Sequence, residues 1–197
     1  MKNIVLLRVL SITAAITLSL HTPSFASSIG QIAEFSMGAA LSSYGHEWGH
    51  ASAAFLHGTD VESVRINKTA FKLSEGLSEP EKKAQLRTIA LAGFFADILA
   101  TELIVQNKAW HGSRFALGWM SAGIYTSLVN PFRFYILGKK KNDLSVYERY
   151  GGDPLLPSLL MAAYAVWTID RIQKSTQIPS ALGEELFIFP VIFAVEL

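Results

Sequence analysis

The residues with the clearest capacity for chemistry are two histidines and a glutamate in the segment His46-Glu47-Trp48-Gly49-His50. On an α-helix, side chains four positions apart lie on the same face, so the imidazoles of His46 and His50 can bind one metal ion. Zinc is the predicted metal, because this spacing pairs two imidazole ligands with a neighbouring glutamate. Zinc lowers the pKa of its bound water to about 7, and Glu47 would take the proton from that water.

The segment that carries this motif is apolar for most of its length. Between Ser28 and Gly58 it has few strongly polar residues outside the motif, chiefly Gln31 and Glu34. We expect a helix from about residue 29 to residue 57, which is long enough for a membrane crossing of about 20 residues. Ionisable groups inside a membrane are costly and usually mark a functional site. The motif is therefore predicted to act within a membrane.

The composition also favours a membrane protein. The chain has 197 residues, enough for one domain, with 50% hydrophobic and 17% charged residues. Charged residues usually make up about a quarter of a globular protein, and the mean hydropathy here is +0.30. A net charge of +1 argues against nucleic-acid binding. Cysteine is absent from the sequence, so a zinc site would have to use histidine and carboxylate ligands.

The N-terminal residues 1–26 have the pattern of a secretory signal peptide. Lys2 and Arg8 supply the positive end, an apolar stretch follows, and Ala26 closes a small-residue cleavage site. The alternative is an uncleaved first membrane helix. The membrane domain would then comprise residues 27–197, and we expect an integral protein of a bacterial inner (cytoplasmic) membrane.

Two elements follow the motif helix. Residues 61–73 partly alternate between apolar and polar side chains and predict one or two β-strands. Such a ribbon is either a plain surface element or an exposed edge that holds an extended substrate near Val64 by strand addition. A helix from about Lys82 to Gln106 is then predicted by a capping box. Within it, Asp97 is either a zinc ligand or a hydrogen-bonding group that faces the bundle.

The second half of the chain supplies the remaining helices and two further candidate site residues. A helix from Ser113 to Val129 should end at Asn130-Pro131. Asn130 is either part of a helix end or an amide that holds substrate near the metal. Asp143 is either the N-cap of a short helix or the third zinc ligand. Lysines 139–141 favour a cytoplasmic loop, which places His50 and Asn130 in the same half of the membrane.

The sequence pattern of the last part of the chain gives a less specific prediction. Residues 154–169 predict a short fourth helix, and residues 186–195 are apolar without a decisive pattern. The expected fold is thus a mainly α membrane protein. It would be a bundle of about three to four transmembrane helices with a small β element after the first mature helix.

The sequence resembles the site-2 protease family of intramembrane zinc metalloproteases. The resemblance extends from about Gly30 to Asp143. It depends on the His-Glu-x-Gly-His motif in an apolar helix, the strand-like residues after it, and the Asn130-Pro131 pair. The Leu-Asp-Gly motif of the family is absent, and Asn142-Asp143-Leu144 is its nearest equivalent.

This resemblance implies a role for each candidate. His46, His50 and Asp143 would bind zinc, while Glu47 would act as general base and then as general acid. Asn130 would orient a transmembrane protein substrate, unwound within the lipid bilayer so that one peptide bond reaches the metal. One alternative is a non-catalytic relative that acts as a membrane binding partner or chaperone. Another is a soluble exported zinc peptidase, in which the apolar helices form a protein core.

Overall fold

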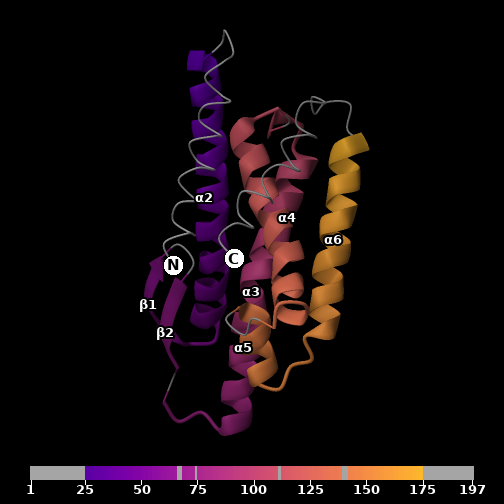
Figure 1. Cartoon of the computed structure of the whole chain (residues 1–197). Coiled ribbons are helices and arrows are strands. Elements are labelled where there is room, and N and C mark those ends of the chain that lie inside the picture. Colours follow the sequence, from indigo (N-terminus) through magenta and orange to yellow (C-terminus); the bar gives the residue numbers. More distant parts are fainter. Residues whose placement is uncertain (1–24, 66–67, 74, 111, 139–141, 175–197) are drawn as a thin grey trace, which may run out of the picture.

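The computed structural model describes residues 25–65, 68–73, 75–110, 112–138 and 142–174. The expected signal peptide lies almost wholly outside these residues, and so does the apolar segment 186–195. The described chain is mostly helical, with a small two-stranded sheet, as expected (Figure 1). In chain order the elements are α2 (Phe25–Leu56), β1 (Asp60–Arg65), β2 (Lys68–Lys72), α3 (Glu79–Gln106), the 3₁₀ turn η1 (Lys108–Trp110), α4 (Arg114–Tyr135), α5 (Asp143–Arg149) and α6 (Leu155–Lys174).

The four long helices lie side by side, and the β-hairpin and α5 lie at one end of them (Figure 1). Helix α2 packs against α3 and α4, and α6 packs mainly against α4. The largest apolar cluster joins these helices and consists of Phe35, Ile104, Ala116, Leu117, Met120, Ile124, Ala165 and Ile172. The two histidines of the motif are in the second half of α2, toward the end that carries α5.

Two glycines allow α2 and α4 to approach each other closely. A Cβ atom on Gly38 would lie 2.0 Å from the Phe115 carbonyl oxygen, and one on Gly118 would lie 2.0 Å from the Phe35 carbonyl oxygen. Any side chain at either position would force the backbones apart. The close contact expected from small residues such as Gly118 is therefore present.

The predicted β element is a two-stranded antiparallel hairpin in which Val64 is opposite Thr69. Helix α3 begins at Glu79, three residues before the expected start, and has the predicted capping box of Ser78 and Glu81. Helix α6 extends to Lys174, beyond the expected end. These differences are small and do not move any candidate residue out of its element.

Two predicted helix boundaries are wrong. Helix α4 does not end at Asn130 but continues through Pro131 to Tyr135. A proline inside a helix removes one backbone hydrogen bond and crowds the preceding turn. The helix nevertheless continues, and Phe134 beyond the proline packs against the buried cluster around Phe94 and Leu144. In addition, Asp143 is not the N-cap of α5, because Asn142 takes that position and Asp143 is the first helical residue.

Two helices of the described chain are long and apolar enough to cross a membrane, namely α3 and the Leu155–Ile172 part of α6. The sequence led us to expect about three to four such helices, including the one with the motif. Within the described residues, neither α2, which carries the motif, nor α4 is among the candidates.

Candidate metal centre

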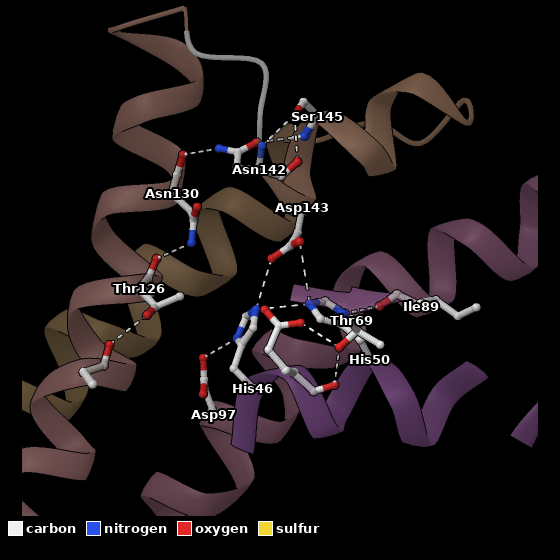
Figure 2. A network of polar contacts seen from close by, with 12 residues as sticks. His46, His50, Thr69, Ile89, Asp97, Thr126, Asn130, Asn142, Asp143 and Ser145 are labelled. Carbon is white, nitrogen blue, oxygen red and sulfur yellow. Dashed lines mark hydrogen bonds and ion pairs between the residues drawn. The ribbon is translucent and has the colours of Figure 1, made fainter. Parts of the chain in front are cut away.

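Three side chains from two distant parts of the chain converge near one end of the bundle. His46 and His50 project from successive turns of α2, and Asp143 reaches them from the first turn of α5 (Figure 2). The Nε2 atoms of the two histidines are 3.2 Å apart. Asp143 Oδ2 lies 3.1 Å from His46 Nε2, and its Oδ1 lies 3.6 Å from His50 Nε2. The structure thus brings together the three residues expected to hold a metal.

One donor atom from each of these three residues lies within 4.8 Å of the other two, which is close enough for the three side chains to hold one metal ion. Two imidazoles and one carboxylate are also a donor set typical of catalytic zinc, which keeps its fourth position open.

Asp97 occupies the other side of His46. Its Oδ2 atom lies 2.7 Å from His46 Nδ1, and its side chain is 4% exposed. Asp97 is therefore a hydrogen-bonding group behind the ring and does not belong to the three converging ligand atoms. A carboxylate behind a metal-binding histidine fixes the orientation of the ring and raises its basicity.

The second histidine is oriented by a backbone group. His50 Nδ1 lies 2.6 Å from the carbonyl oxygen of Ile89 on α3, and a carbonyl can only accept, so Nδ1 carries the proton. The same reasoning assigns a proton to His46 Nδ1 facing the Asp97 carboxylate. The Nε2 atoms of both rings and the Asp143 carboxylate face one another, and a group of donor atoms arranged in this way can hold a metal ion.

Gly93 on α3 lies against the Nε2 atoms of the two rings. A Cβ atom at this position would lie 2.5 Å from His46 Nε2 and 2.7 Å from His50 Nε2. Only glycine lets α3 approach the cluster this closely. The role of Gly93 was missed in the sequence, where its one signal is a glycine inside an apolar helix.

Helix α5 is held in place by its N-cap. The Oδ1 atom of Asn142 accepts a hydrogen bond from the Ser145 amide at 3.0 Å, and its Nδ2 donates to the Asn130 carbonyl oxygen at 3.2 Å (Figure 2). The backbone of Asn130 thereby ties the start of α5 to α4. The side-chain amide of Asn130 donates back to the Thr126 carbonyl at 3.1 Å. In this conformation Asn130 therefore supports the element that carries Asp143.

Glu47 is buried, with 7% of its surface exposed. The hydroxyl of Thr69 on β2 lies 2.7 Å from Glu47 Oε2 and 3.0 Å from the Glu47 carbonyl oxygen. The hairpin thus sits against α2 beside the motif, with Val64 on β1 directly opposite Thr69. The Thr69 contact was not foreseen, because no local pattern relates the two positions.

Access to the cluster is greatest from the side of α5. The side chain of Asp143 is 29% exposed, whereas those of His46 and His50 are 11% and 8% exposed. Burial opposes ionisation of the Asp143 carboxyl, but its hydrogen bonds with His46 and His50 outweigh that effect and hold its pKa below its usual range. Asp143 is thus an anionic group at neutral pH, as a metal ligand must be.

Comparison with known proteins identifies no relative: no family model, curated protein or solved structure matches this chain. The case for a function therefore depends on the geometry of the site and on the motif that builds it.

Proposed function

We propose that this protein is a zinc-dependent intramembrane endopeptidase that resembles the site-2 protease family. The observation that carries the proposal is the convergence of one donor atom each from His46, His50 and Asp143 within 4.8 Å, with Glu47 next to His46 in the chain. Two neutral imidazoles and one carboxylate suit zinc better than magnesium or calcium, which prefer oxygen ligands.

Zinc at this site would supply a Lewis acid that lets water lose a proton near neutral pH. The protein groups would handle that proton. Glu47 would accept it as the water oxygen bonds to the scissile carbonyl carbon, and would return it to the amide nitrogen as the C–N bond breaks. Asp97 and the Ile89 carbonyl would hold the imidazoles in orientation during these steps.

Asn130 and Val64 remain proposed as substrate contacts. Asn130 would have to release the Thr126 carbonyl before its amide could bind substrate. Val64 is on β1 of a two-stranded hairpin, where an extended peptide could pair with a strand edge. The substrate class that fits is the unwound part of a transmembrane segment.

The membrane location is supported by apolar side chains on the surface of the two candidate spans. On α3, Phe95, Leu99 and Leu103 form a stripe and are each more than 60% exposed. On α6, Leu156 and Val166 are comparably exposed. Water would disfavour such a surface, whereas lipid would cover it.

Two charged residues within these helices, Glu102 and Arg171, pair with each other. Glu102 on α3 accepts hydrogen bonds from Arg171 on α6 and, at 2.8 Å, from the Tyr164 hydroxyl. The Arg171 guanidinium stacks over the Trp167 ring at 3.7 Å. Ionisable groups in membrane helices are usually paired in this way, so the pair is compatible with a bilayer and supports the same proposal.

The test combines metal content with proteolysis. Detergent-purified wild type should contain about one zinc ion per chain, and Glu47→Gln should keep the zinc because it changes the base and no ligand. Membrane proteomes of cells that express either form should then differ by at least one membrane protein cleaved only in the presence of wild type. Zinc without any such cleavage would favour the non-catalytic alternative, and a folded wild type without zinc would overturn the proposal.

A further inference from the structure

The hydroxyl of Thr69 is the one side-chain group on the hairpin that the described structure places on the proposed base. It lies within hydrogen-bond distance of two acceptors of the same residue, Glu47 Oε2 at 2.7 Å and the Glu47 carbonyl oxygen at 3.0 Å. A threonine hydroxyl has one proton to donate. It therefore either bonds one of these acceptors or shares its proton between them.

The contact with the carboxylate oxygen Oε2 is the shorter of the two. Because hydrogen bonds weaken with distance, the hydroxyl should hold the carboxylate of Glu47 more firmly than its carbonyl oxygen.

The position of Thr69 links the orientation of the Glu47 carboxylate to the hairpin. Thr69 is on β2 opposite Val64, and the hairpin packs on α2. A shift of the hairpin would move the hydroxyl away from Glu47, because a hydrogen bond weakens steeply with distance and angle. The carboxylate of Glu47 is therefore contacted by β2, which carries none of the three proposed metal ligands.

We propose that Thr69 is a positioning residue, which orients the Glu47 carboxylate toward the metal site and makes that orientation depend on how the β-hairpin is docked. This inference deepens the proposed function and rests on it. Thr69 holds the Oε2 atom of Glu47, and the other carboxylate oxygen would take the proton of water.

The experiment measures binding and does not depend on turnover. Cobalt replaces zinc in the purified protein, and acetohydroxamic acid is titrated while the visible spectrum of the metal is recorded. A hydroxamate binds a metal through two oxygens and passes its hydroxyl proton to a neighbouring base, so its affinity reports whether Glu47 is in place. Thr69→Val keeps the β-branched shape but loses the hydroxyl, and Thr69→Ser keeps the hydroxyl.

We expect Thr69→Val to bind acetohydroxamic acid about tenfold more weakly than wild type, at unchanged cobalt content. Thr69→Ser should stay close to wild type. A matched control is Thr88→Val, because the Thr88 hydroxyl donates only to the Ala84 carbonyl within α3 among the contacts described for it. Glu47→Gln gives the affinity for acetohydroxamic acid of a site without a base.

The outcomes separate the two proposals. Equal binding by Thr69→Val and wild type would overturn the role of Thr69 and leave the proposed function standing. Weak binding by Thr69→Ser as well would also overturn it, since the hydroxyl would then not be the cause. A wild type that binds neither cobalt nor zinc would overturn the proposed function. A cobalt-loaded wild type should bind acetohydroxamic acid more tightly than Glu47→Gln does. If it does not, the role of Glu47 is overturned, and with it the role of Thr69.

Discussion

Asp97 and Asp143 take opposite sides of one imidazole ring. Asp97 Oδ2 is 2.7 Å from His46 Nδ1, and Asp143 Oδ2 is 3.1 Å from Nε2 of the same ring (Figure 2). The two carboxylates therefore have different parts in the proposed site. Asp143 would bind the metal, and Asp97 would hold the histidine that binds it.

Substitution of the two aspartates should separate these parts. Asp143→Ala removes a ligand and should leave the purified protein without stoichiometric zinc. Asp97→Ala should lower zinc affinity about 10- to 100-fold and still fill at excess zinc, as expected for loss of a group behind a ligand. Metal analysis after dialysis against a series of buffered zinc concentrations would measure both. Asp153→Ala is the control, because Asp153 accepts a hydrogen bond from the Leu155 amide at the start of α6 and is not one of the converging ligands. The opposite order of the two effects would make Asp97 the ligand.

Gly93→Ala should disrupt the metal site with little change in overall fold. The added methyl would lie 2.5 Å from His46 Nε2, so at least one ring must move. We expect zinc affinity to fall by about tenfold or more, as for other changes that disturb ligand orientation. Zinc titration together with a helical circular dichroism spectrum measures this. Gly30→Ala, on α2, is the control because a Cβ there meets nothing within 4 Å. If Gly93→Ala keeps the zinc affinity of wild type, the close contact between α3 and the two imidazole rings does not matter for metal binding.

Asn142 should matter through the helix that it caps. Asn142→Ala loses the acceptor for the Ser145 amide and the donor to the Asn130 carbonyl. Loss of an N-cap costs about 1 kcal/mol, and Asp143 would be held less firmly, so both unfolding free energy and zinc affinity should fall. Asn142→Asp keeps the cap acceptor and loses the Nδ2 donor. If Asn142→Asp matches wild type in zinc affinity, the tie to Asn130 does not contribute to the site.

Removal of the metal should lower the stability of the protein, because the metal would connect α2 to α5. A ligand that binds only the folded state raises its stability, by about 4 kcal/mol at a thousand times its dissociation constant. Chelation should therefore lower the Tm of wild type in detergent, and added zinc should restore it. His46→Ala should show no response to chelator or zinc. A Tm of wild type that is insensitive to both would argue against a bridging metal.

The membrane crossing by α3 can be tested at its two ends. The chain lacks cysteine, so single cysteines can be introduced without background. Lys83 and Asn107 are exposed residues near the start and just after the end of α3. An impermeant maleimide should label Asn107→Cys in intact cells and Lys83→Cys only after permeabilisation, since the site end is expected to be cytoplasmic. Labelling of both positions in intact cells, or release of the protein by alkaline carbonate, would contradict the crossing.

Local features of the site could be predicted from the sequence alone. His46 and His50 face the same way because one helical turn dictates it, and the hairpin and the capping box of α3 depend on neighbouring residues. The chemistry of the pair and the presence of Glu47 beside it follow from a five-residue motif. Such short-range relationships need no knowledge of the rest of the fold.

Only the tertiary structure decided between Asp97 and Asp143. Both are dozens of residues from the motif, and their distance from His46 depends on how α3 and α5 pack on α2. The same holds for Thr69 and Gly93, whose roles arise from contacts between elements. Asn130-Pro131 also failed as a helix end: proline disfavours a helix interior, but α4 continues to Tyr135, and Phe134 there packs against residues of other elements. The sequence determined which residues could do chemistry, and long-range packing determined which of them meet.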